Sequence, residues 1–119
     1  MRKNCTIYKT ASFIGKRWTL LIILEIYKGD KDWIRYSALK NRLMDITPKI
    51  LSARLKELEK ENLIKRRVDT KNFPIKSEYT LTEMGKEFIK VIEKMKDWAL
   101  KYKIDNQECE IKTCKECGF

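Results

Sequence analysis

Histidine is absent from this 119-residue chain, and that absence excludes several kinds of chemistry at once. Without an imidazole there is no histidine general base, no Ser-His-Asp triad and no metal site with a histidine ligand. Glycine occurs only four times, and no glycine-rich loop of the type that cradles phosphates is present. No nucleophile lies beside an evident base, and no paired carboxylates mark a cleft. We therefore expect that the protein is not an enzyme.

Long hydrophobic runs are also missing. No apolar stretch reaches the roughly 20 residues that a membrane-spanning helix needs. The amino-terminal residues MRKNCTIYKT lack the continuous apolar region of a secretion signal. These two absences predict a cytoplasmic protein that has no membrane partner.

Acidic residues are fewer than basic residues. Seventeen Asp and Glu stand against 27 Lys and Arg, so the formal net charge is +10 and the isoelectric point is near 9.5. A field of this sign attracts an acidic partner, either nucleic acid or an anionic membrane surface. Hydrophobic residues make up 43% of the chain, which is enough for a single globular domain with its own core.

The stretch 46–82 contains the most informative pattern, a helix followed by a hairpin. Thr47 is a good helix cap, Pro48 suits the first helical position, and Asn62 can adopt the left-handed conformation that ends a helix. We therefore expect a helix over 48–61. At 100° per residue its apolar face consists of Leu51, Leu55 and Leu58, and its polar, basic face consists of Lys49, Ser52, Ala53, Lys56 and Lys60.

A two-stranded wing is expected over 64–81. The runs 63–68 and 76–81 have strand-like composition and flank a polar turn. Residues 49–67 carry seven basic against three acidic side chains, a net charge of +4 beside a helix of the size that enters a major groove. The alternative is that this basic face is simply solvated, as Lys-rich outer faces of helices usually are.

Three further helices are expected before this stretch, over 6–14, 18–27 and 36–43. The second is apolar on nearly all sides and should be buried. The third should direct its apolar residues inward, and those residues are Tyr36, Leu39, Leu43 and Met44. Trp33 and Ile34 leave room for a very short strand that pairs with the hairpin. This order predicts a mainly α protein with a small β-hairpin wing, a winged helix-turn-helix.

A last helix should open at the cap residue Thr82 and run to about Lys103. Its apolar residues recur at alternating steps of four and three from Met84 onward, a pattern typical of a seam between long helices. Such a helix spans ~30 Å, longer than the core of a small domain. The alternative is that the stripe covers its own domain. We expect a homodimer, and the candidate interface residues are Ile7, Phe88, Val91, Met95, Trp98 and Tyr102.

The four cysteines are unevenly placed, with Cys5 alone and Cys109, Cys114 and Cys117 close to the carboxyl end. We divide the chain into a DNA-binding and dimerisation domain over 1–104 and an acidic, cysteine-containing tail over 105–119. The spacing of Cys114 and Cys117 is that of a metal knuckle or a redox pair, and Cys109 could add a third thiolate.

Three readings of the tail cysteines stay open: a zinc or iron-sulfur site, a thiol-disulfide pair, and a passive tail. Because histidine is absent, a metal site would need a fourth ligand from Cys5, from water or from another subunit. No other feature of the sequence requires a cofactor.

Several linked motifs resemble a known family. They are Cys5, IGKRWTLLIIL at 14–24, RYSAL at 35–39, ITPKILSARLKELE at 46–59 and EYTLTEMG at 78–85. In this order and spacing the chain resembles the HxlR-type winged helix-turn-helix transcriptional regulators, which are related in fold to the MarR group.

The resemblance covers about 5–98 and implies a homodimer through the first and last helices, a recognition helix matching 47–60 and wings that lie along the phosphates. In some family members a cysteine at the position of Cys5 senses electrophiles or oxidants. The alternative is that Cys5 is a small buried apolar residue. The family's paired glycine is replaced by GKRW at 15–18, and the wing looks about one residue longer.

These inferences combine into an expected mechanism, in which a two-fold dimer places two recognition helices in successive major grooves of a pseudo-palindromic operator. The DNA-binding candidates in and before the helix are Thr47, Lys49, Ser52, Ala53 and Lys56, and the phosphate candidates of the wing are Arg66, Arg67, Lys71 and Lys76. Arg54 is left out, because it lies at the edge of the buried face and can pair with an acidic neighbour.

The response expected of such a regulator is to redox state, a metal or a small molecule. Two other functions are alternatives to a sequence-specific regulator. The first is a basic nucleic-acid-associated or architectural protein without sequence preference. The second, less favoured, is a small thiol redox protein that works through Cys114 and Cys117.

Overall fold

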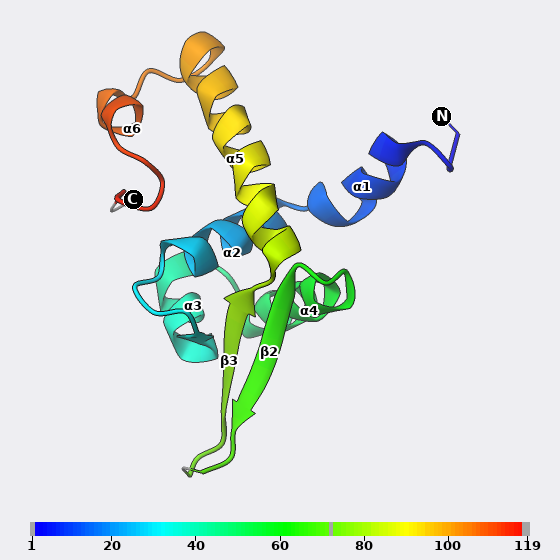
Figure 1. The fold of residues 1–119 in the computed structure, drawn as a ribbon, viewed down its shortest axis with the longest axis vertical. Helices are drawn as coiled ribbons and strands as arrows, with labels where there is room; N and C mark the ends of the chain where they lie inside the picture. Colours follow the sequence, from blue (N-terminus) through cyan, green and yellow to red (C-terminus); the bar gives the residue numbers. More distant parts are fainter. Residues whose placement is uncertain (1, 72, 118–119) are drawn as a thin grey trace.

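The computed structural model describes residues 2–71 and 73–117 (Figure 1). The helices are α1 (Thr6–Ile14), α2 (Arg17–Lys28), α3 (Tyr36–Leu43), α4 (Pro48–Lys60), α5 (Glu83–Tyr102) and α6 (Gln107–Ile111). The strands are β1 (Ile34–Arg35), β2 (Ile64–Asp69) and β3 (Lys76–Leu81), and they form an antiparallel sheet in the order β1-β3-β2. The predicted fold class, a mainly helical winged helix-turn-helix with a long carboxyl-terminal helix, is confirmed.

Helix α2 lies at the centre of the core, as its apolar sequence predicted. Its residues Ile22 and Ile23 are fully buried, and the helix packs against α3, α4 and α5. The predicted apolar face of α4 faces this core, since Leu51, Leu55 and Leu58 are each at most 1% exposed. Burying such a side chain contributes roughly 1.5–3 kcal/mol, so this face fixes the rotation of α4 about its axis.

The predicted third strand is also confirmed. Ile34 pairs with Tyr79 and Arg35 with Glu78, which attaches β1 to the hairpin of β2 and β3. Beyond this short pairing the hairpin extends away from the body as a two-stranded wing (Figure 1). No described helix combines the length and the apolar character needed to cross a membrane.

Met44 corrects one sequence-based prediction, because it does not face inward. It adopts a positive φ of 53° directly after α3 and is 79% exposed. The reversed backbone lets Ile46, which is 1% exposed, enter the core in the turn before α4. The helical periodicity that placed Met44 inward ends at Leu43, so it could not describe this turn.

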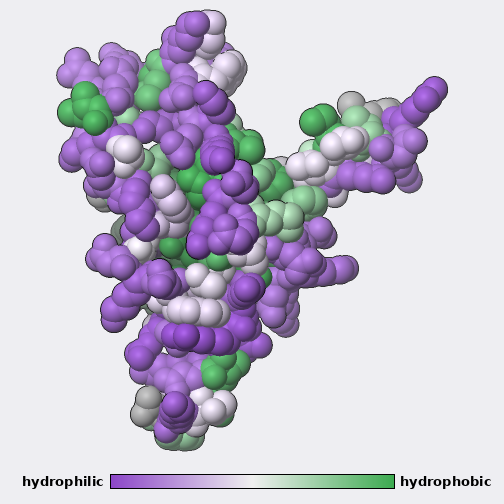
Figure 2. Space-filling view, in the orientation of Figure 1, coloured by the Kyte–Doolittle hydropathy of each residue, from purple (hydrophilic) through white to green (hydrophobic). Residues whose placement is uncertain are grey.

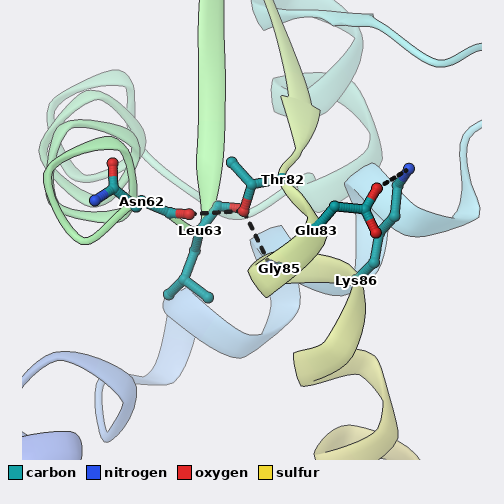
Figure 3. Close-up of polar contacts among 6 residues, drawn as sticks. All are labelled: Asn62, Leu63, Thr82, Glu83, Gly85 and Lys86. Atoms are coloured by element: carbon teal, nitrogen blue, oxygen red, sulfur yellow. Dashed lines mark hydrogen bonds and ion pairs between the residues drawn. The ribbon is translucent and has the colours of Figure 1, made fainter.

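The ends of α4, β2 and α5 meet in one hydrogen-bonded junction (Figure 3). Asn62 has the predicted left-handed conformation, with φ 63°. The Thr82 hydroxyl donates to the Asn62 carbonyl at 2.6 Å and accepts from the Gly85 N–H at 3.0 Å. Beside this cap, Glu83 and Lys86 form an exposed ion pair. The junction ties the start of α5 to the end of α4.

Gly85 is packed too closely in this junction for any other residue. A Cβ atom built at Gly85 would lie 2.2 Å from the Leu63 carbonyl oxygen, a backbone atom that cannot rotate away. The absence of a side chain therefore sets how near α5 comes to β2.

Helix α1 and the far half of α5 project from the body (Figure 1). No residue of α1 is buried, and Ile7 is 69% exposed. In Figure 2 hydrophobic surface is visible between the arm formed by α1 and the base of α5. The radius of gyration is 15.4 Å, larger than the ~13.5 Å expected for a compact chain of this length.

Candidate nucleic-acid interface

The helix-turn-helix unit consists of α3, the turn after it and α4. Thr47 caps α4 as predicted, since its hydroxyl accepts from the Ile50 N–H at 3.2 Å. The Tyr36 hydroxyl joins the two helices, because it donates to the Pro48 carbonyl at 3.2 Å and lies 3.3 Å from the Ser52 hydroxyl. Sequence reasoning placed Tyr36 in the core and missed this contact, for which the sequence carries no local signal.

The outward face of α4 is basic and open. Lys49, Ala53 and Lys56 are all exposed. Within residues 2–71 and 73–117 neither lysine ammonium group forms a hydrogen bond or an ion pair. Two ammonium groups on one face of a capped helix are thus available to an acidic partner, while Ser52 is half-buried against Tyr36.

Arg54 is engaged within the protein, as expected from its place at the edge of the apolar face. Its guanidinium lies 2.7 Å from the Glu57 carboxylate, which also accepts from Lys16 at 2.9 Å. Arg54 is therefore paired within α4 and does not add to the open basic face, while Glu57 joins α4 to Lys16 in the segment before α2.

The wing carries its arginines in two different settings. Arg66 donates to the Ser77 hydroxyl at 3.0 Å. Arg67 donates to Glu78 at 3.1 Å, and its guanidinium carbon lies 4.2 Å from the centre of the Trp33 ring. Arg67 thus braces the base of the wing through an ion pair and a cation–π contact, a role that sequence reasoning missed.

Lys71 and Lys76 complete the predicted cationic set of the wing. Lys71 is exposed near the tip, where its N–H donates to the Asp69 carboxylate at 3.1 Å. Lys76 begins β3 and is half-buried. The fold therefore brings the candidates of α4 and of the hairpin together, with β2 of the wing packed against α4.

The cysteines lie at two separate parts of the molecule. Cys5 is the cap residue of α1 and is half-buried. Cys109, Cys114 and Cys117 lie in the tail, which forms α6 and returns toward α2. Over residues 2–71 and 73–117 no disulfide forms and no three His, Cys, Asp or Glu side chains are arranged to hold a metal ion.

The tail, which we expected to be separate from the domain over 1–104, is attached to α2 and α5 by hydrogen bonds. The Lys115 ammonium donates to the carbonyls of Tyr27 and Gly29 at the end of α2, and Lys96 of α5 donates to the Lys112 carbonyl at 2.7 Å. The sequence-based prediction did not include α6, which Asn106 caps through its side-chain oxygen, accepting from the Cys109 N–H at 3.1 Å.

Comparison with known proteins places this geometry in a family. The model of the HxlR-like helix-turn-helix family matches residues 13–107. The HTH-type transcriptional regulator YdeP of Bacillus subtilis (strain 168) is 36% identical over 101 residues, which is 85% of this chain and 76% of YdeP.

Solved structures agree with the sequence relatives. A transcriptional regulator assigned to the MarR family from Porphyromonas gingivalis W83 superposes with a TM-score of 0.74 at 29% identity, covering 86% of this chain and 96% of that one. The redox regulator HypR in its oxidized form gives a TM-score of 0.71 at 27% identity, with coverage of 84% and 99%. The fold, the matched residues and these relatives together show that the chain is a transcriptional regulator of the HxlR-like helix-turn-helix family.

Proposed function

We propose that this regulator acts as a homodimer that binds a pseudo-palindromic operator, with α4 of each subunit in one of two successive major grooves. The observation that carries the proposal is the contrast on α4 between Arg54, which is paired with Glu57, and the lysines of the outward face, which are not paired within the described chain. A protein keeps unpaired cations on a capped helix at little cost, and a phosphate-lined groove gives them partners.

The proposed roles follow from chemistry and position. Lys49 and Lys56 donate to guanine or to phosphate, and the exposed Ala53 methyl packs on thymine. The Ser52 hydroxyl can donate to a base only after it leaves the Tyr36 hydroxyl. Thr47 lies at the start of α4, where phosphates approach the free N–H groups of the first turn. From the wing, Lys71 and Lys76 contact the backbone of the duplex. Arg66 and Arg67 join them by exchanging their contacts with Ser77 and with Glu78 and Trp33 for phosphates.

Selection of bound duplexes from a random pool tests this function directly. The expected result is a two-fold symmetric motif whose half-sites are about 10 base pairs apart, centre to centre. The logarithm of affinity should fall with the logarithm of salt by roughly 0.9 per phosphate contact. Equal recovery of all sequences would instead favour the architectural alternative, and a flat salt dependence would contradict both.

The dimer is supported by two surfaces that the described chain leaves largely uncovered. Helix α1 packs on the core only at its end, through Phe13 and Ile14, and it buries no residue, whereas a helix of nine residues on its own is not stable in water. The body of the protein binds α5 through Gly85, Ile89 and Ile92, whereas the predicted stripe lies on a different face, where Val91 is 50% and Trp98 is 56% exposed. Phe88 is half-buried between these faces and contributes to the core as well.

Charge placed on the exposed stripe should separate the subunits. We expect Val91→Glu combined with Trp98→Glu to convert the protein to a monomer, because two carboxylates per subunit would have to be desolvated in the interface. Light scattering after size exclusion measures the mass, and operator affinity should fall in parallel. Lys90→Glu combined with Lys94→Glu, on the neighbouring surface of α5, is the control that should remain dimeric. A monomeric wild type would exclude the proposal.

We also propose that Cys5 makes the regulator responsive to oxidants. The support is its position as the cap of an otherwise unburied helix, where a change at the thiol reaches the dimer surface, and the likeness to the redox regulator HypR. We expect a thiol oxidant such as diamide to lower operator affinity by at least roughly tenfold. Cys5→Ser should remove that response and keep the operator affinity of the untreated protein. If Cys5→Ser responded to diamide as the wild type does, another residue would carry the response.

A further inference from the structure

The tail forms one wall of an open apolar cavity of about 580 Å³ between α2 and α5. This volume is within the range of small-molecule sites. Its floor is formed by Leu20 and Leu24 of α2 and by Ile92 and Ala99 of α5. Its outer wall is the tail, from which Cys109, Cys114 and Cys117 line the cavity. The tail thus brings three thiols to a surface that would otherwise be a flat apolar face.

The tail lines the cavity without filling it. Its described apolar side chains point away, since Ile104 is 55% and Ile111 is 80% exposed. The tail is held instead by polar contacts, namely Lys115 with the carbonyls at the end of α2 and Lys96 with the Lys112 carbonyl. The Lys115 ammonium also lies 4.9 Å from the centre of the Tyr27 ring. The attachment of the tail therefore leaves the space between the thiols and the helices open.

The charged groups at the rim are already engaged within the protein. Glu25 lies 3.5 Å from Lys28 and 3.6 Å from Arg42. Arg17 lies over the Trp18 ring at 4.8 Å. A charged ligand would have to break one of these contacts or enter without a counter-charge, which is costly in an apolar site. The apolar walls therefore favour an uncharged ligand, while Arg17, Lys28, Lys96 and Glu25 at the rim keep their contacts within the protein.

The cysteine side chains give the cavity a polarisable surface. Burial raises the pKa of the Cys114 thiol above its usual range, although the nearby Lys96 acts in the opposite direction. Cys114 is therefore protonated at neutral pH and is a weak nucleophile. Protonated thiols are small, polarisable and mainly apolar surfaces, which suit an aromatic or aliphatic ligand.

The cavity is distinct from the proposed dimer surface. On α5 the residues Ile92, Lys96 and Ala99 follow the face that packs on the body, whereas Val91 and Trp98 lie roughly 100° away around the helix. Met95 lies between the two faces and contributes to both. A second subunit seated on the stripe would leave the cavity accessible from the side of the tail.

We propose that this cavity binds an uncharged, predominantly apolar small molecule and that its occupancy changes operator affinity. The regulatory half of this inference rests on the proposed function. A ligand seated there would stabilise the docked tail, which holds the end of α2 at Gly29. That segment leads to Trp33, the residue against which Arg67 of the wing is stacked.

Fluorescent probes on the reduced, full chain test the binding half. We expect saturable binding of the neutral N-phenyl-1-naphthylamine, and weaker binding of its sulfonated analogue 1-anilinonaphthalene-8-sulfonate despite the positive charge of the protein. Cys114→Leu and Ala99→Leu each place a larger side chain in the cavity, from opposite walls. Each variant should lower the affinity for the neutral probe by roughly tenfold or more. Ser37→Leu, which adds an apolar side chain to the exposed surface of α3 outside the cavity, should leave binding within about twofold.

Several results would overturn the assignment. Unchanged probe affinity in both filling variants, with circular dichroism verifying that they fold, would place the probe elsewhere. Preference for the sulfonated probe would contradict the selection for neutral ligands. Probe binding that is sensitive to Cys114→Leu but has no effect on the affinity of a selected duplex would overturn the regulatory half. Failure to bind any duplex selectively would count against the proposed function and leave probe binding intact.

Discussion

Gly85→Ala is expected to lower the free energy of unfolding by about 3 kcal/mol and the midpoint of thermal unfolding by roughly 10 °C. The added Cβ would lie 2.2 Å from the Leu63 carbonyl oxygen, so either α5 or β2 must move. Alanine favours helix over glycine by at most about 1 kcal/mol, and the steric cost outweighs that gain. Denaturant unfolding of both proteins, followed by circular dichroism, measures the difference.

Gly29→Ala is the matched control for this prediction. A Cβ at Gly29 would meet its nearest atoms at 3.5 and 3.6 Å, which is ordinary contact. Its stability should therefore stay within roughly 0.5 kcal/mol of the wild type. Similar losses for the two variants would show that the contact with Leu63 does not limit the packing of α5. Because Gly85 also borders the cap of Thr82, a smaller loss of operator affinity should accompany the loss of stability.

The second large effect is expected at the outward face of α4. Lys49→Glu combined with Lys56→Glu should lower operator affinity by about 100-fold or more at moderate salt, because a dimer would present four repelling charges to the duplex. The salt dependence should become shallower by roughly 0.9 for each phosphate that the variant no longer touches. Titration of a labelled selected duplex by fluorescence anisotropy at several salt concentrations measures both quantities.

Lys90→Glu combined with Lys94→Glu provides the comparison at equal net charge. Both residues are exposed on α5, outside the helix-turn-helix unit. If the two double variants lost affinity equally, the overall field of the protein rather than α4 would carry binding. Lys56→Ala alone should also relax the preference for one base pair of each half-site. A strict preference retained in that variant would remove Lys56 from the residues that contact bases.

Much of the scaffold of the interface could be predicted because its signals are local. The cap at Thr47, Pro48 at the first helical position and the left-handed Asn62 bound α4 to within one residue. The leucines at helical spacing then fixed which side of α4 is buried. The same reasoning identified the exposed stripe on α5, since periodicity distinguishes a face that packs on the body from one that does not.

The contacts that hold the site could not be predicted, because they join residues far apart in the chain. Tyr36 reaches Pro48 and Ser52, and Arg67 meets both Trp33 and Glu78, only after the sheet and the helices have packed. Spacing in the sequence gives no distance between such side chains. The prediction of an inward Met44 was wrong for a related reason, since a turn is set by the elements on either side of it.

By itself, then, the sequence determined the order of the elements from α1 to α5, their approximate bounds, the family, and the polarity of the faces of α4 and α5, because caps and periodicity act over three or four residues. Only the tertiary structure decided which cations of α4 and the wing are paired within the protein and which stay open to a partner, and how closely α5 approaches β2 at Gly85. It also decided that the tail returns to α2 and forms one wall of an open cavity lined by thiols. Those properties depend on distances between atoms that the chain brings together only when it folds.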